Sequence, residues 1–247
     1  MKKTLLAAAS ALLATAVFSC SENNSSNPAP APEPETQSYV WEFDNADGWV
    51  YFHQDTATID QWAIVDGKLA LTTRANTYDR TKMHTADNDY AAGTYKWRTY
   101  VPAIAPGEQV SVGSWIYCDD HHELDFEVGY GTAASRAQCG AGADDLVACM
   151  TNQDFPFKSG YTPVKAGWHD YELKLDVGSD GKYTAIWSID GSEKQRLKLG
   201  FGPEYGFAIQ CSVENLKFLG DKIPASDYTG LFDRVSFDGT KSTSTTH

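Results

Sequence analysis

The chain has 247 residues, of which 42 % are hydrophobic, and its formal net charge is −13 at pH 7. Such an acidic protein repels phosphate backbones, so nucleic acids and other polyanions are disfavoured as partners, whereas neutral sugars and bound cations are compatible. The length suits a targeting segment followed by one sandwich or barrel of ordinary size.

The N-terminus carries a targeting pattern. Lys2 and Lys3 precede an apolar run over residues 5–18, and Ser19 and Cys20 follow it. A basic start, a short apolar run and a small-residue cleavage site predict a secretory signal peptide over residues 1–19. The run is too short for a membrane-spanning helix. A cysteine directly after the cleavage point resembles a bacterial lipoprotein signal, which implies lipidation of Cys20; the alternative is an ordinary signal with an incidental cysteine.

The next segment, residues 20–37, is rich in Ser, Asn, Pro, Ala and Glu and lacks apolar periodicity. Such a composition predicts a disordered tether. Residues 240–247 are rich in Ser and Thr and predict a disordered tail. We therefore expect one folded domain over residues 38–239, outside the cytoplasm and lipid-anchored at the outer membrane or cell surface.

The domain has an all-β pattern. Short segments rich in Val, Ile, Tyr, Trp and Thr are separated by turn dipeptides such as Asp66-Gly67 and Asp190-Gly191. No segment keeps a helical period for three turns. Many short strands between regular turns predict a β-sandwich or jelly roll.

Four segments share an asymmetry between their two faces: 95–101, 110–118, 123–128 and 206–213. In each, alternate residues are apolar, and the others are polar or aromatic, so one side of a strand faces the core. If these strands share one sheet, its other face is a groove suited to sugars; the alternative is a solvated outer face. Segments 170–176 and 183–189 have inward apolar rows and predict the covering sheet.

Segment 123–127 contains the candidate catalytic residues. Glu123, Asp125 and Glu127 alternate along it and project from one face of a strand. Gathering like charges is costly because each raises the pKa of the others. A retaining glycosidase uses such a pair, one carboxylate as nucleophile and one carboxylic acid as proton donor, about 5–5.5 Å apart. Without further support, the pattern also fits a solvated acidic strand or a cation site.

The same segment resembles the E-(I/L)-D-(I/F)-E signature of glycoside hydrolase family 16, which includes jelly-roll β-glucanases, laminarinases, agarases and carrageenases. Further segments resemble family motifs in family order: 62–69 (W-x-x-x-D-G-x-L), 93–98 (Y-G-x-(F/Y)-E-x-R), 187–191 (W-Y-V-D-G) and 233–237 (D-Y-V-R-V-Y). The resemblance implies a concanavalin-like β-jelly-roll sandwich of two antiparallel sheets with a concave substrate cleft.

The resemblance also implies roles for individual residues. Glu123 would be the nucleophile, Glu127 the general acid/base and Asp125 the assisting carboxylate. The implied substrate-binding residues are Arg98, Trp115, Tyr117, Gln210 and Lys96.

The chain departs from the family pattern at several positions. Lys96 stands where the family usually has Glu, and Ser212 where it often has a cleft tryptophan. His121 and His122 precede Glu123, where Gly or Asp is more usual; His122 either tunes a carboxylate or ends a loop. These departures leave the sugar and linkage open.

The remaining predictions concern metal ions, disulfides, cofactors and oligomeric state. The family often carries a structural calcium on the convex face, for which the resemblance implies Asp44 and Asp233 as ligands. Cys118, Cys139, Cys149 and Cys211 permit two disulfides in three pairings and lack zinc-site spacing. We expect no catalytic cofactor, and a monomer.

The function predicted by these patterns is a retaining endo-β-glycosidase that hydrolyses a β-glucan or algal galactan by double displacement. The alternatives are a non-catalytic, glycan-binding surface lipoprotein on the same fold and a structural or adhesion lipoprotein. A polysaccharide lyase is disfavoured because the expected cleft offers mainly Lys96 and Arg98 as basic groups.

Overall fold

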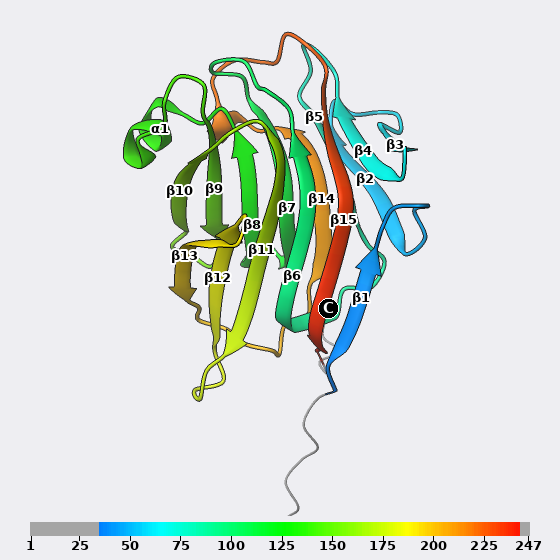
Figure 1. Ribbon diagram of the computed structural model, residues 1–247, viewed down its shortest axis with the longest axis vertical. Helices are drawn as coiled ribbons and strands as arrows, with labels where there is room; N and C mark the ends of the chain where they lie inside the picture. Colours follow the sequence, from blue (N-terminus) through cyan, green and yellow to red (C-terminus); the bar gives the residue numbers. More distant parts are fainter. Residues whose placement is uncertain (1–34, 243–247) are drawn as a thin grey trace, which may run out of the picture. The chain divides into compact units, whose positions relative to one another are not determined.

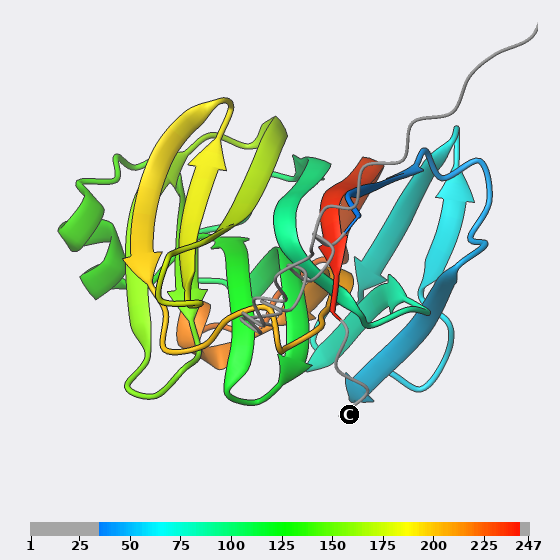
Figure 2. The ribbon, with the colours of Figure 1, turned by 90° about the horizontal axis from the view of Figure 1, so that it is seen from below.

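The computed structural model describes residues 35–242. The predicted signal peptide, Cys20 and most of the tether lie outside the described residues, as does most of the predicted tail. Within this range the chain forms two antiparallel sheets stacked as two layers, a jelly-roll sandwich (Figures 1 and 2). The predicted all-β class is confirmed.

The eight-stranded sheet has one main path, with β1 (Gln37–Trp41) pairing β15 beside it. Its order is β13 (Ser192–Lys198), β12 (Tyr183–Ile189), β11 (Gly167–Val177), β6 (Tyr90–Val101), β15 (Tyr228–Lys241), β4 (Lys68–Thr73) and β3 (Trp62–Val65). The two-residue hairpins of this sheet use the predicted turns, because Asp66, Gly67, Asp190 and Gly191 all have positive φ, as type I′ turns require.

The seven-stranded sheet carries the acidic segment near its middle. Its order is β10 (Lys158–Val164), β9 (Leu146–Asn152), β8 (His122–Gly129), β7 (Val110–Asp119), β14 (Ala208–Asn215), β5 (Asp79–Thr85) and β2 (Trp49–Asp55). A short helix, α1 (Ala133–Cys139), follows β8, and a 3-10 turn (Lys217–Leu219) follows β14. Among residues 35–242 no helix is long and apolar enough to cross a membrane.

The core lies between the sheets. The apolar rows predicted to face inward are buried there, including Leu124 and Phe126 of β8 and Leu173 and Trp187 of the covering sheet. Two indoles tie the layers together: Trp187 Nε1 donates to the carbonyl of Asp125, and Trp97 Nε1 to that of Gln210, each at 3.0 Å. The covering sheet therefore fixes the backbones of β8 and β14.

The four segments with an asymmetry between their faces do not all share one sheet. Segment 95–101 forms part of β6 in the eight-stranded sheet, whereas segment 123–128 lies in β8 of the seven-stranded sheet. Alternation identifies which residues share a face of a strand but carries no information about which sheet the strand joins.

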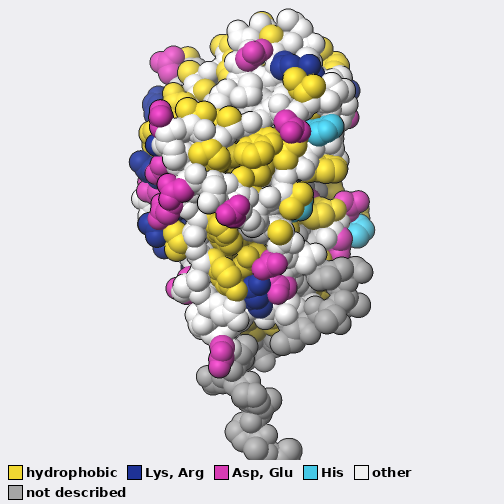
Figure 3. All heavy atoms as spheres, turned by 90° about the vertical axis from the view of Figure 1, so that its right-hand side faces the viewer, with side chains coloured by type: hydrophobic (Ala, Val, Ile, Leu, Met, Phe, Trp, Pro, Cys, Tyr) yellow, Lys and Arg dark blue, Asp and Glu magenta, His cyan; other side chains and the backbone are white. Residues whose placement is uncertain are grey.

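The side formed by β1–β4 exposes hydrophobic side chains scattered among charged and polar ones (Figure 3). Val50 and Phe52 of β2 and Val65 of β3 are each between 45 % and 49 % exposed. Apolar side chains dispersed in this way are normal on a protein surface.

Candidate active site

The three predicted carboxyl side chains lie together on the face of β8 that points away from the core. Their alternation with buried Leu124, Phe126 and Val128 forces this orientation. On β7, Tyr117 lies opposite Glu123, Trp115 opposite Asp125 and Gly113 opposite Glu127. A Cβ at Gly113 would lie 2.3 Å from Ser212 Oγ and 3.1 Å from Glu127 Oε1, so the glycine makes room for Glu127.

These residues form the floor of a groove with two halves. The β5 half, about 590 Å³, is bounded by residues of β2, β5, β7 and β14. The β10 half, about 410 Å³, is bounded by β8–β10 and the 3-10 turn. Glu123, Trp115 and Arg80 line both halves. Glu123 therefore lies where the halves meet, with open space on either side for a polymer chain.

Asp125 and Glu123 share a hydrogen-bond donor. Gln153 Nε2 donates to Glu123 Oε1 at 2.7 Å and to Asp125 Oδ2 at 3.2 Å. Burial, with the neighbouring charges of Glu123 and Glu127, raises the pKa of Asp125 well above its usual range. The raised pKa favours the protonated form of Asp125, and a proton there lowers the pKa of Glu123.

The two glutamates have separate environments. Burial raises the pKa of Glu123 to about 7, while the bond from Asp125 and the charge of Lys82 oppose the rise. Burial and the charge of Glu214 raise the pKa of Glu127 to about 8, opposed by the hydrogen bond that Ser111 donates. The pKa of Glu127 is raised further than that of Glu123, which is the order that a proton donor beside a nucleophile requires.

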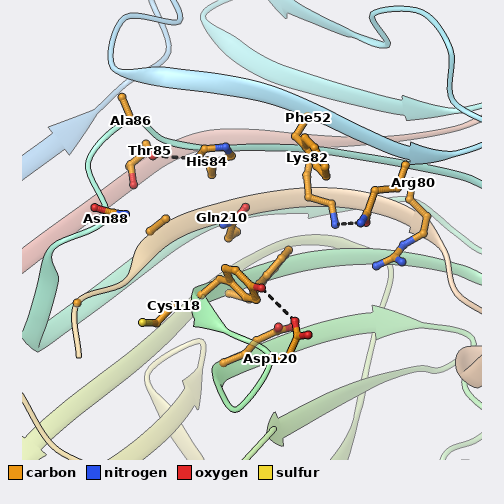
Figure 4. A pocket seen from close by; sticks show the side chains of 16 residues that line it. Phe52, Arg80, Lys82, His84, Thr85, Ala86, Asn88, Cys118, Asp120 and Gln210 are labelled. Atoms are coloured by element: carbon orange, nitrogen blue, oxygen red, sulfur yellow. Dashed lines mark hydrogen bonds between the residues drawn. The ribbon is translucent and has the colours of Figure 1, made fainter. Parts of the chain in front are cut away.

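An ion cluster in the groove was not predicted from the sequence. Arg80 and Lys82 project from β5 toward the space that Gln210 of β14 faces (Figure 4). Arg80 Nε pairs with Glu214 Oε2, and Lys82 Nζ lies 3.2 Å from Glu214 Oε1. The signal was present: Arg80, Lys82 and His84 alternate with Thr81 and Met83 along 80–84. Glu214 continues the groove-facing row of segment 206–213 by one position.

Gln153 was also missed from the sequence. It follows β9, and its side chain reaches the carboxyls from that loop. No periodic pattern identifies such a residue.

Three of the predicted substrate-binding residues line the groove: Trp115, Tyr117 and Gln210. The Trp115 indole donates to Ser212 Oγ at 3.0 Å, so it lies over the position where a cleft tryptophan is missing. The Tyr117 hydroxyl donates to Asp120 Oδ1 at 3.0 Å. The structure thus places all three side chains in the groove.

The prediction that Arg98 and Lys96 line the cleft is wrong. Both lie on the outer face of β6, in the opposite sheet, because Tyr95, Trp97 and Thr99 occupy the inner face. Arg98 Nη1 pairs with Asp170 Oδ2 at 3.1 Å, and Lys96 Nζ with Glu172 Oε2 at 3.0 Å. Two layers of side chains separate them from the groove.

The predicted calcium ligands do not assemble into a side-chain site. Asp233 lies 3.4 Å from Lys68 Nζ in an ion pair. Residues 35–242 contain no group of three or more His, Cys, Asp or Glu side chains that could hold a metal ion. A calcium at Asp44 and Asp233 stays a prediction.

The cysteines and His122 have structural surroundings. Cys118, Cys139, Cys149 and Cys211 are all unpaired, so no disulfide joins them. Cys211 faces the core, whereas Cys149 lies opposite Glu127 and lines the groove. His122 stacks on Tyr205 with ring centroids 3.6 Å apart. It also bonds Asp119 at 2.8 Å, which fits the interpretation that it ends a loop.

No protein-family model and no curated protein sequence matches the chain. Solved structures do. The catalytic domain of an endo-1,3-β-glucanase (laminarinase) from Thermotoga petrophila RKU-1 has a TM-score of 0.61 at 13 % identity, over 84 % of this chain and 99 % of that one. A β-1,3-1,4-glucanase (lichenase) from a mouse hindgut metagenome has a TM-score of 0.56 at 16 % identity, over 83 % and 99 %.

A third similar structure is the Crh5 transglycosylase in complex with NAG, with a TM-score of 0.58 at 18 % identity, over 82 % of this chain and 84 % of that one. The chain therefore has a glycoside hydrolase-type jelly-roll fold. More particularly, the fold is like that of glycoside hydrolase family 16. Identities this low describe the fold alone; the reaction has to be argued from the site.

Proposed function

We propose that the chain is a retaining endo-β-glycosidase that hydrolyses a polysaccharide of the β-glucan or algal galactan class. One observation carries the proposal: alternate carboxyl side chains of a single strand lie on the floor of a groove that continues to both sides of Glu123. A groove open on both sides suits cleavage within a chain. The glucanase names of the similar structures support the substrate class.

The reaction proceeds in two displacements. The Glu123 carboxylate attacks the anomeric carbon while Glu127 donates its proton to the glycosidic oxygen, so the bond to the leaving sugar breaks and a glycosyl ester forms on Glu123. Glu127, now a carboxylate, removes a proton from water. The oxygen of that water attacks the anomeric carbon, the ester bond to Glu123 breaks, and Glu123 leaves as a carboxylate.

The surroundings support this division of roles. The amide of Gln153 donates to Glu123, and Asp125 lowers the pKa of Glu123, so both stabilise a negative charge there. Glu127 receives a hydrogen bond from Ser111 but lies in the field of Glu214, which favours its protonated form. Asp125 therefore assists the nucleophile and keeps the two glutamates in different protonation states.

The test is release of reducing ends from a panel of β-glucans and algal galactans by the wild type, Glu123→Gln and Glu127→Gln. We expect release by the wild type and a loss of about 10³-fold or more in each variant. Product anomers followed by proton NMR should retain the configuration of the substrate. An initially inverted anomer would contradict the role of Glu123 as nucleophile.

A glycan-binding protein without activity would give a different result. It would retain a polysaccharide in affinity electrophoresis, yet no panel member would yield new reducing ends or longer transfer products. That outcome, with folded protein and intact Glu123 and Glu127, would replace the hydrolase proposal. Transfer products in place of new reducing ends would keep the covalent step and change the acceptor from water to sugar.

We further propose that the chain is exported and anchored to the cell envelope by a lipid on Cys20, because its N-terminus resembles a lipoprotein signal. Expression with labelled palmitate in a bacterial host should label the wild type and not Cys20→Ser. Mass spectrometry should place the mature N-terminus at residue 20. A label retained in Cys20→Ser, or a different mature N-terminus, would contradict the anchor.

A further inference from the structure

Glu214 is a buried acidic residue in the groove that forms and breaks no bond in the proposed two-step reaction. Its side chain is 1 % exposed. Glu214 is the second-last residue of β14 and lies on the same face as Gln210 and Ser212. Lys82 and Arg80 each contact one of its carboxylate oxygens. Lys82 is itself 6 % exposed and also donates to Gln54 Oε1 at 3.0 Å. Glu214 is therefore held by two cations in a buried ion cluster.

The register of the sheet brings this charge near Glu127. Strands β14 and β8 pair with opposite edges of β7, where Glu214 lies opposite Ser111 and Glu127 lies opposite Gly113. Ser111, directly beside Glu214, donates its hydroxyl proton to Glu127. Ser111 therefore lies beside one carboxyl group and contacts the other. Both line the β10 half of the groove.

Two neighbouring carboxyl groups in a buried site cannot both ionise cheaply. Because Glu214 is paired with Arg80 and Lys82, ionisation of Glu127 would place a second negative charge beside this cluster. The pKa of Glu127 is raised, as this repulsion requires. Burial is the largest cause and the charge of Glu214 the next, whereas the charge of Lys82 lowers the pKa. The other groups around Glu127 are Glu123 and Asp125 on its own strand, Arg80 on β5 and the Cys149 thiol on β9.

We propose that Glu214 is a positioning residue, whose fixed negative charge keeps the proton on Glu127 and so makes Glu127 the acid of the pair. The inference deepens the proposed function and rests on it for its catalytic meaning. The retention of the proton itself is a property of the free protein. It can therefore be measured without any substrate.

The experiment follows the Glu127 side chain by carbon-13 NMR of protein labelled at the glutamate carboxyl, with Glu127→Gln to assign the signal. In the wild type the signal should titrate near pH 8. In Glu214→Gln, loss of a charge about two strand spacings away should move the midpoint down by about one pH unit. Glu214→Asp should restore most of the wild-type value.

Lys82→Met is the matched control, because it removes a positive charge where Glu214→Gln removes a negative one. It removes a positive charge from the same cluster while Arg80 still holds Glu214, so the Glu127 midpoint should move up. With an active substrate, the alkaline limb of the kcat profile should move in the same direction in each variant. A lost contact that only loosened the fold would not move the two variants in opposite directions.

A Glu127 midpoint that stays within about 0.3 pH units of wild type in Glu214→Gln would overturn the inference, whatever Lys82→Met does. Should Glu214→Gln fail to fold, the double variant Glu214→Gln/Lys82→Met removes the buried charge together with a partner. A Glu127 midpoint in the double variant that is no lower than in Lys82→Met alone then contradicts the inference. The Glu127 midpoint could move in opposite directions in Glu214→Gln and Lys82→Met while the wild type releases no sugar. That result would support the role of Glu214 in keeping the proton on Glu127 and would refute the proposed hydrolase activity. The two proposals therefore fail separately.

Discussion

Replacing Glu127 by glutamine should stabilise the protein at alkaline pH while abolishing the proposed activity. Glu127 is 8 % exposed. Burial first, and then Glu214, raise its pKa from 4.5 to about 8. As pH rises from 4.5 to 8, the unfolded chain loses this proton while the folded protein retains it, so unfolding becomes progressively easier. The stabilising effect is complete below pH 4.5 and lost above about 8.

The size of the effect follows from the same values. The difference between 4.5 and about 8, at about 1.36 kcal/mol per pKa unit, amounts to about 5 kcal/mol as an upper bound. Glutamine has no proton to lose and still accepts a hydrogen bond from Ser111. We therefore expect Glu127→Gln to exceed the wild type in free energy of unfolding by about 3–5 kcal/mol at pH 9, and by about 1 kcal/mol or less at pH 5.

Urea unfolding at pH 5, 7 and 9 measures the effect in the wild type and Glu127→Gln. The control is Glu172→Gln, which removes a carboxylate from a surface ion pair with Lys96 and should change stability by no more than about 1 kcal/mol at any pH. Parallel curves of unfolding free energy against pH for the wild type and Glu127→Gln would refute the reasoning. They would mean that the folded protein does not hold the proton that the mechanism needs.

Three further predictions concern activity and packing. Turnover should follow a bell-shaped pH profile with its maximum between about 7 and 8; a plateau from pH 5 to 7 would contradict the roles of the two glutamates. Trp187→Phe removes the donor to the Asp125 carbonyl and should cost about 2–4 kcal/mol in urea unfolding, and a cost below about 1 would contradict this. Arg98→Ala should leave KM within about twofold of the wild type, whereas Trp115→Ala should raise KM about fivefold or more. A larger increase of KM in Arg98→Ala than in Trp115→Ala would mean that the substrate binds on the eight-stranded sheet.

Much of the fold could be predicted because its signals are local. The period of two along β8 identified Leu124 and Phe126 as core residues and Glu123 and Glu127 as groove residues. The same rule identified the inward rows of β11 and β12. The turn dipeptides fixed the hairpin ends because a positive φ restricts the choice of residue. These inferences need no knowledge of which strands are neighbours.

The errors lie where neighbours matter. Arg98 matched a family position, but strand order decides that β6 belongs to the covering sheet. Glu214 and Arg80 come from segments more than a hundred residues apart, and only the pairing of β14 with β5 joins them. Gln153 reaches the site from a loop. Unpaired Cys211 faces the core, which compartment-based reasoning about disulfides could not reveal.

The groove itself depends on the opposite sheet. Buried carboxyl groups repel one another and cost stability, so the strand that carries them has to be held by contacts elsewhere. The indoles of Trp187 and Trp97 provide such contacts, because each donates from the covering sheet to the backbone of a groove residue, Asp125 or Gln210. A shift of β8 or β14 by even a fraction of an ångström would change the spacing of the groove side chains. The two tryptophans therefore link the packing of the core to the geometry of the proposed reaction.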